Sequence, residues 1–187
     1  MKEVEIKFNV ADVAALRKRL RALKFKLKTR RTHEFNTLYD LPDGSLRQRG
    51  EVLRLRKYGD DWKLTHKARG SAGRHKSREE SESRVEDGKQ VEKIIQSLGY
   101  RPSFRYEKFR EEWSSGKGHV VVDETPIGNI AEIEGAPRWI DETARKLGVE
   151  KSGYSTKSYA ELFYQWKERT GSSADEMTWK AIGRRKR

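Results

Sequence analysis

Two glutamates and a lysine alternate along the first residues of the chain, and this spacing could hold a metal ion or a phosphate group. In a β-strand successive side chains point to opposite faces, so Glu3, Glu5 and Lys7 would share one face, while the apolar residues between them share the other. Two carboxylates on one face repel each other unless a cation lies between or opposite them. The opening strand therefore predicts a charged site that other segments must complete.

Six further segments alternate in the same way between charged and apolar residues. In a flat sheet the charged face would be a solvated face, which is the ordinary interpretation for any one strand. The seven segments taken together do not fit that interpretation, because their charges are grouped by type and because predicted helices with apolar faces could cover the apolar side of the sheet. We therefore expect the charged side to line the inside of a closed sheet. Its residues are Arg54, Arg56, Lys63, Lys67, Lys76, Arg78, Glu80, Glu82, Lys108, Arg110, Asp123, Glu132 and Glu134.

A closed sheet lined by both signs of charge is costly to desolvate unless ions fill it. A polyanion bound by the Arg and Lys side chains, together with divalent cations bound by the carboxylates, would fill it economically. Mg²⁺ and Mn²⁺ accept carboxylate and phosphate oxygens together, and arginine makes bidentate contacts with phosphate. The pattern predicts a polyphosphate ligand with a hard divalent metal.

The composition favours an anionic partner as well. The 187 residues carry a formal net charge of +13 and contain no cysteine. Nucleic acid, an acidic membrane surface and a small polyphosphate would all suit this charge. Basic residues recur inside predicted strands rather than at one end, which disfavours a nucleic-acid patch. The absence of an apolar run of membrane-spanning length and of an apolar signal stretch predicts a cytoplasmic protein that does not enter a membrane.

The periodicity predicts an α+β fold of eight strands and about four helices. We expect residues 1–168 to form one domain, and residues 169–187, which are polar and then basic, to form a flexible tail. The expected helices cover 11–24, 88–98, 137–147 and 158–168. The expected strands cover 1–8, 29–40, 52–58, 62–68, 76–85, 104–113, 119–124 and 128–134.

An ordered set of motifs resembles one known family. The N-terminal ExExK of Glu3–Lys7 is followed by Asn36–Asp40 before a turn, and Ser158-Tyr159 opens the last helix. Between them lie Leu53–Arg56, Trp62–Lys67, Lys76–Glu80, Tyr106–Arg110, Val122–Gly128 and Glu132–Gly135. Over residues 1 to about 165 the chain resembles the CYTH superfamily, or triphosphate tunnel metalloenzymes. It is most similar to the branch of class IV (CyaB-like) adenylyl cyclases and thiamine triphosphatases.

The resemblance implies a closed eight-stranded antiparallel β tunnel with flanking helices, which binds a triphosphate with Mg²⁺ or Mn²⁺. It implies metal-side carboxylates at Glu3, Glu5, Asp123, Glu132 and Glu134. It implies phosphate contacts at Lys7, Arg54, Arg56, Lys63, Arg78, Lys108 and Arg110. For Lys67, Lys76, Glu80, Glu82 and Lys157 a role in the tunnel and an exposed charge at a strand end or loop both stay open.

Members of this superfamily perform two reactions with the same charged groups. A cyclase attacks the α-phosphorus of ATP with the ribose 3′-hydroxyl and releases cyclic AMP and pyrophosphate. A triphosphatase uses water to attack tripolyphosphate, thiamine triphosphate or a nucleotide. The resemblance favours the cyclase, with the triphosphatase as the alternative. A non-catalytic binder of RNA or polyphosphate is a third hypothesis. A small-molecule triphosphate is the expected partner, nucleic acid is not, and a homodimer is open.

Overall fold

Eight strands form one closed antiparallel barrel in the computed structural model, which describes residues 2–183. Around the barrel the order is β1-β9-β8-β7-β2-β3-β4-β6, and pairing of β6 with β1 closes it. This confirms the predicted eight-stranded tunnel. The strands are β1 (Lys2–Asn9), β2 (Lys26–Asp40), β3 (Val52–Tyr58), β4 (Asp61–Lys67), β6 (Lys76–Val85), β7 (Arg101–Ser114), β8 (Gly118–Thr125) and β9 (Gly128–Gly135), and a short β5 (Ser71–Ala72) pairs with β6.

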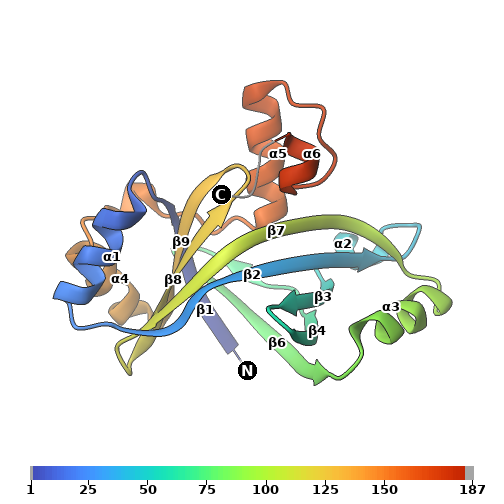
Figure 1. Ribbon diagram of the computed structural model, residues 1–187, viewed down its shortest axis with the longest axis horizontal. Helices are drawn as coiled ribbons and strands as arrows, with labels where there is room; N and C mark the ends of the chain where they lie inside the picture. The colour runs from blue at the N-terminus through green and yellow to red at the C-terminus, as the bar shows by residue number, and fades with distance from the viewer. Residues whose placement is uncertain (1, 184–187) are drawn as a thin grey trace.

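The two longest strands, β2 and β7, lie side by side across the molecule (Figure 1). Both are longer than the sequence predicts. The added residue Lys26 of β2 is opposite the added Ser114 of β7, and the added Arg101 of β7 is opposite Asp40. Irregularities in the register interrupt this ladder in three places, and such bulges bend a strand. Pairing with a distant partner extends these strands, and no local pattern carries that information.

Four helices begin after residues whose side chains cap them: Asp12, Asp87, Ser158 and Thr178. Asp12 accepts a hydrogen bond from the backbone N–H of Ala15 at 3.0 Å, and Ser158 forms a capping box with Glu161. The long helices fall within a few residues of the predicted ranges. The helices are α1 (Val13–Ala22), α2 (Ser45–Gln48), α3 (Gly88–Ser97), α4 (Pro137–Lys146), the 3-10 turn η1 (Lys151–Gly153), α5 (Tyr159–Thr170) and α6 (Trp179–Ile182).

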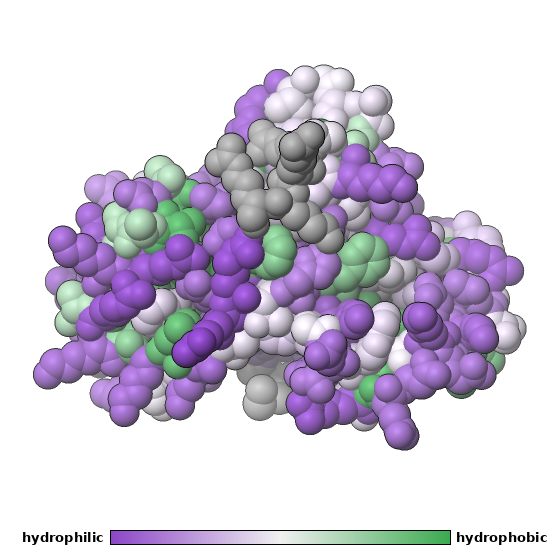
Figure 2. All heavy atoms as spheres, viewed as in Figure 1, coloured by the Kyte–Doolittle hydropathy of each residue, from purple (hydrophilic) through white to green (hydrophobic). Residues whose placement is uncertain are grey.

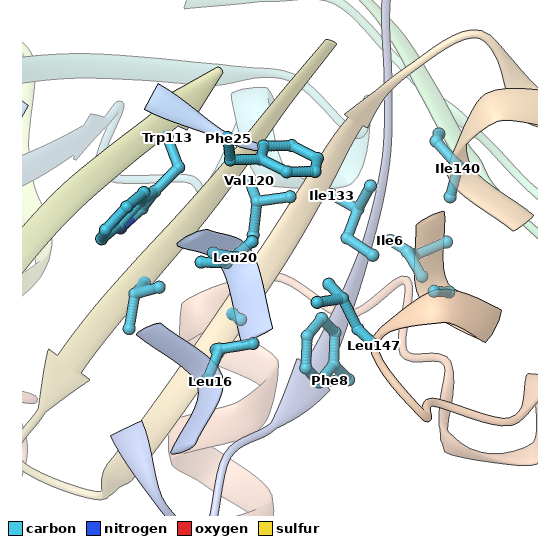
Figure 3. Close-up of a cluster of buried hydrophobic side chains, with 13 residues drawn as sticks. Ile6, Phe8, Leu16, Leu20, Phe25, Trp113, Val120, Ile133, Ile140 and Leu147 are labelled. Carbon is cyan, nitrogen blue, oxygen red and sulfur yellow. The ribbon is translucent and has the colours of Figure 1, made fainter. Parts of the chain in front are cut away.

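The apolar faces of the strands lie outside the barrel, where helices cover them. Helices α1 and α4 pack on one side (Figure 1). There Ile6 of β1 and Ile133 of β9 are completely buried together with Leu20 of α1 and Ile140 of α4 (Figure 3). Full burial of one such side chain contributes about 1.5–3 kcal/mol. The apolar outer face confirms the predicted orientation, with charged residues on the inside.

The segment after α5 packs against the barrel, whereas the sequence predicts a flexible tail from residue 169. Backbone bonds join Met177 to both Arg105 and Glu107 of β7, and the backbone N–H of Trp179 donates to the Glu107 carboxylate at 2.9 Å. Met177 is completely buried. These residues occupy a stretch of β7 edge that β8 leaves open, because β8 pairs only from Phe109 onward. The basic residues 184–187 lie outside the described range.

Hydrophilic side chains dominate the surface shown in Figure 2, and the apolar residues form small separate groups. Within residues 2–183, no helix combines the length and the apolar character that a membrane span requires.

Candidate functional site

A cavity of about 1520 Å³ lies inside the barrel and extends to its rim. The structure places most of the predicted site residues on its lining. These are Glu3, Glu5, Lys7, Arg54, Arg56, Lys67, Lys76, Arg78, Glu80, Glu82, Lys108, Arg110, Glu132 and Glu134. Three predicted residues lie elsewhere: Lys63 and Asp123 do not line the cavity, and Lys157 borders a separate pocket of about 330 Å³.

Three glutamates from two neighbouring strands form what we call the carboxylate cluster. The register pairs Glu5 of β1 with Glu134 of β9, and Glu132 lies two residues away on the same face. One carboxylate oxygen from each lies within 4.8 Å of the others. Burial raises the pKa of Glu134 to about 8, and the negative charges of Glu132 and Glu3 add to this shift.

The carboxylate cluster fits a divalent cation. Its donors are all carboxylate oxygens, which Mg²⁺ and Mn²⁺ prefer. The raised pKa of Glu134 shows that the carboxylates repel one another as the site stands, and a cation among them would relieve that repulsion. These three residues would therefore hold the metal.

Lys7 lies beside the carboxylate cluster and is bound to two of its members. Its Nζ is 2.6 Å from Glu5 and 3.3 Å from Glu132. Burial would lower the pKa of Lys7, but the charges of Glu132 and Glu5 outweigh it and raise the pKa. Burial would likewise raise the pKa of Glu132, yet Arg110 and Lys7 hold it well below its usual range. Lys7 is thus a fixed cation at one edge of the cluster.

Glu3 lies outside the carboxylate cluster, with Glu80 and Lys67. Lys67 forms an ion pair with Glu80 and lies 3.6 Å from Glu3. Burial raises the pKa of Glu3, and a hydrogen bond with Glu80 adds to the shift. The structure therefore places Lys67 and Glu80 inside the tunnel, where the sequence left their position open.

Three arginines that line the cavity have a buried Nε atom with no hydrogen-bond partner among the described residues: Arg54, Arg56 and Arg78. Their terminal nitrogens are held in place: Arg56 donates to Glu82 at 2.8 Å, and Arg78 donates to the carbonyl oxygen of Gly50 at 2.9 Å. A buried donor without an acceptor costs about 1–3 kcal/mol. Phosphate oxygens in the cavity would supply such acceptors.

Two further charged residues that line the cavity, Glu82 and Lys76, lie in different surroundings. Glu82 accepts hydrogen bonds from Lys63 at 2.7 Å and from Thr65 at 2.9 Å. Burial would raise the pKa of Glu82, but Lys63 and Arg56 lower it to about 2. Lys76 has no ion-pair partner among the described residues, and burial, with the nearby charge of Lys7, lowers its pKa.

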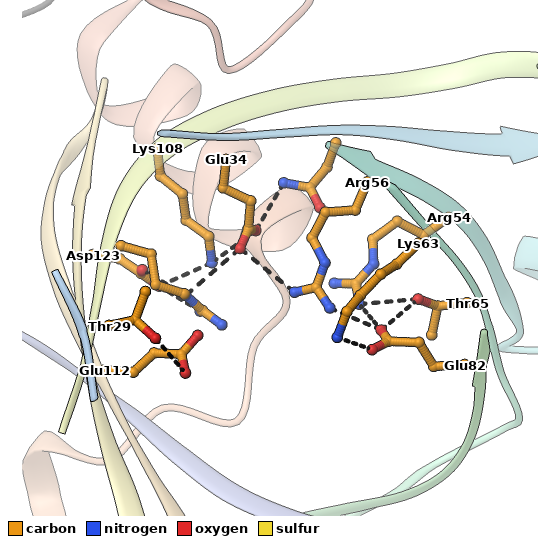
Figure 4. Close-up of polar contacts among 12 residues, drawn as sticks. Thr29, Glu34, Arg54, Arg56, Lys63, Thr65, Glu82, Lys108, Glu112 and Asp123 are labelled. Carbon is orange, nitrogen blue, oxygen red and sulfur yellow. Dashed lines mark hydrogen bonds and ion pairs between the residues drawn. The ribbon is translucent and has the colours of Figure 1, made fainter. Parts of the chain in front are cut away.

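A buried glutamate that the sequence did not single out, Glu34 of β2, lies in the adjoining wall formed by β2, β7 and β8 (Figure 4). Its carboxylate lies 3.4 Å from Lys108, 3.5 Å from Arg56 and 3.8 Å from Arg110. Burial would raise the pKa of Glu34, but Lys108 and Arg110 hold it well below its usual range. Alternation along the predicted strand 29–40 places Glu34 on the same face as Asn36. Two polar residues on one strand face are the feature of the sequence from which Glu34 could have been predicted to face the tunnel.

Asp123 belongs to this wall rather than to the carboxylate cluster. It is completely buried and accepts hydrogen bonds from Lys108 at 2.9 Å and from Arg110 at 2.8 and 2.6 Å. The hydroxyl of Tyr159, at the start of α5, also donates to it. Burial, and then the charge of Asp123, raises the pKa of Tyr159 well above its usual value. We call Glu34, Lys108, Arg110 and Asp123 the paired cluster.

Known proteins share both the sequence pattern and the architecture. An archaeal relative from Methanocaldococcus jannaschii, named as a candidate adenylate cyclase, is 27% identical over 87% of this chain and 98% of its own. The adenylate cyclase CyaB of Aeromonas hydrophila is 25% identical over 87% of this chain and 89% of its own.

Solved structures show the same fold at lower identity. A candidate adenylate cyclase from Vibrio parahaemolyticus aligns with a TM-score of 0.76 at 18% identity, over 87% of this chain and 97% of its own. A Hippeastrum protein, described as a candidate adenylyl cyclase with a dominant triphosphatase activity, aligns with a TM-score of 0.62 at 18% identity, over 87% of this chain and 95% of its own. The family model of the CYTH domain matches residues 1–164, and the chain belongs to the CYTH domain family.

Proposed function

We propose that this protein is a divalent-metal-dependent enzyme that binds a triphosphate in its tunnel and converts ATP to cyclic AMP and pyrophosphate. One observation carries the proposal: the cavity has buried arginine donors without acceptors and, separately, a carboxylate cluster with mutual repulsion. A polyanion and a divalent cation would satisfy both at once. The two relatives named as adenylate cyclases support the choice of reaction.

The charged groups of the tunnel would have separate roles in binding. Arg54, Arg56 and Arg78 would hold phosphate oxygens, and Lys7 and Lys76 would add positive charge near the carboxylate cluster. A bound divalent metal would supply charge neutralisation on the reacting phosphoryl group. The lysine and the arginine of the paired cluster are held in place before substrate arrives, so they would need little reorganisation when negative charge develops.

Hydrolysis of the triphosphate is the second candidate function. It is favoured by the triphosphatase activity described for the Hippeastrum protein, whose fold this chain shares. Both reactions need the same cations and carboxylates, and they differ in the nucleophile and in the phosphorus atom that it attacks.

Product analysis separates the candidates. The purified protein is incubated with Mg²⁺ or Mn²⁺ and, separately, with ATP, tripolyphosphate or thiamine triphosphate. Cyclic AMP with pyrophosphate is the expected outcome for ATP, whereas orthophosphate would establish hydrolysis. If no substrate gives a product with either metal, both enzyme proposals fail.

The hypothesis of a non-catalytic RNA or polyphosphate binder predicts that the basic C-terminal segment provides the affinity for the polyanion. Deleting residues 171–187 is a poor test, because it also removes the buried Met177 and Trp179. Deleting only the last four residues leaves this packing in place. We expect that deletion to leave metal-dependent turnover unchanged, whereas Glu134→Gln abolishes it.

A further inference from the structure

An exposed aromatic ring lies at the rim of the cavity, where the charged lining ends. Tyr164 of α5 is 50% exposed. Among the described residues with large, exposed hydrophobic side chains, it is the one that lines the cavity. A single exposed aromatic residue is ordinary on a protein surface, so its surroundings decide whether it has a role.

Tyr164 and Phe104 together form what we call the aromatic shelf. The two ring centroids lie 6.2 Å apart with an angle of 33° between the ring planes. Phe104 is almost buried, so the shelf presents mainly the ring of Tyr164. Ala160, one helical turn before Tyr164, also lines the cavity, and its small side chain leaves the space beside the ring open.

Strand register places the aromatic shelf beside the phosphate-binding arginines. Leu38 of β2 is opposite Arg54 on one side and opposite Phe104 on the other. Neighbouring strands lie about 4.8 Å apart, so the backbones of Arg54 and Phe104 are separated by about 10 Å. A group attached to a triphosphate at Arg54 could reach the shelf across this distance.

The size of the cavity also exceeds what a phosphate chain needs. Its volume of about 1520 Å³ is above the ~300–1,000 Å³ that is typical of small-molecule sites. The rim beyond the arginines is formed partly by apolar side chains, including Leu41, Pro42 and Pro102. Charged side chains, including Arg47 and Arg101, also line the cavity. The apolar side chains add surface that a planar organic group would bury and that an inorganic polyphosphate would not use.

We propose that the aromatic shelf binds a planar aromatic group carried by the triphosphate, and that Tyr164 selects such substrates over inorganic tripolyphosphate. The inference rests on the proposed triphosphate-binding function and narrows its substrate class. Stacking of one base on an aromatic side chain contributes about 1–3 kcal/mol, which corresponds to roughly 5- to 150-fold in affinity.

The test compares Tyr164→Ala, Tyr164→Phe and the control Glu168→Ala, an exposed residue of the same helix that does not line the cavity. KM and kcat are measured for ATP, thiamine triphosphate and tripolyphosphate, and the melting temperature of each variant is recorded. We expect Tyr164→Ala to raise KM about tenfold or more for at least one aromatic substrate and to leave tripolyphosphate unaffected. Tyr164→Phe and Glu168→Ala should behave as wild type.

Two outcomes would overturn the shelf while leaving the tunnel function intact. One is turnover of tripolyphosphate alone, and the other is a Tyr164→Ala variant whose KM values are all unchanged or all raised equally. If the wild-type protein turns over none of the substrates, the proposed reaction fails. Calorimetry of ATP and tripolyphosphate binding to wild type and Tyr164→Ala then still tests whether the aromatic shelf binds the base. In Tyr164→Ala the affinity for ATP should fall, whereas the affinity for tripolyphosphate should not change.

Discussion

The paired cluster and the carboxylate cluster both contain acidic side chains inside the barrel, yet they differ in how far the charges of these carboxylates are satisfied. In the paired cluster, Asp123 is surrounded by hydrogen-bond donors and Glu34 by cations. In the carboxylate cluster, Glu134 lies near other carboxylates and its pKa is raised to about 8. Buried charge is found throughout the tunnel, and under the proposed function the unsatisfied charge marks the part that binds a metal ion.

The largest effect should come from the carboxylate cluster. Glu134→Gln removes a proposed metal ligand, and loss of charge stabilisation worth several kcal/mol corresponds to on the order of 100-fold or more in turnover. Steady-state assays at saturating Mn²⁺ measure this loss. The control is Glu79→Gln, which changes an exposed residue of the same barrel. Equal activity of the two variants would contradict the proposal that Glu134 binds the metal.

In the paired cluster, removal of Glu34 should affect mainly stability. Glu34→Gln removes one buried counter-charge of Lys108, Arg110 and Arg56, which keep their ion pairs with Asp123 and Glu82. The loss in stability should therefore reach at most the ~3–5 kcal/mol that breaking a buried ion pair costs. Urea unfolding in the absence of metal measures the free energy of unfolding. Under the same conditions Glu134→Gln should be neutral or stabilising, because it removes a carboxylate that its neighbours repel. The reverse order of stabilities would contradict the distinction between the clusters.

The unsatisfied arginines should affect substrate binding by a smaller factor. Arg78→Ala removes hydrogen bonds to a charged phosphate that contribute about 1.5–3 kcal/mol, so KM for the triphosphate should rise about tenfold or more. Arg84→Ala on the same strand, whose side chain is exposed and pairs with Asp61, serves as the comparison. A KM for Arg78→Ala that matches this control would show that Arg78 does not contact phosphate.

The smallest effect concerns the dependence of stability on pH. The pKa of Glu82 lies near 2 in the fold, against an ordinary value of 4.5. A lowered pKa contributes stability above pH 4.5, and that contribution is lost as the pH falls from about 4.5 toward 2. Urea unfolding of wild type and Glu82→Gln from pH 6 to 3 measures it. The difference between the two proteins should shrink as the pH falls, and a constant difference would refute the assignment.

Much of the barrel could be predicted from the sequence because alternation is a local property. The pattern around Arg54 and Arg56, with leucines between them, gave both the strand and the face that lines the tunnel. The start of β2 and both ends of β7 could not be predicted, since they depend on pairing between residues such as Lys26 and Ser114. The packing of Met177 was missed for a related reason: its partner is an open strand edge more than sixty residues away.

The sequence by itself determined most of the charged residues that line the cavity and, through the order of its motifs, the family. Only the tertiary structure decided what each charge contacts. Asp123 and Glu134 both follow the alternating pattern, but pairing of β7 with β8 brings Lys108 and Arg110 to Asp123, whereas pairing of β1 with β9 brings Glu5 to Glu134. The physical reason is that a charge interacts most strongly with the charges nearest to it, and more strongly still at low dielectric. Strand pairing around the barrel determines which charges those are.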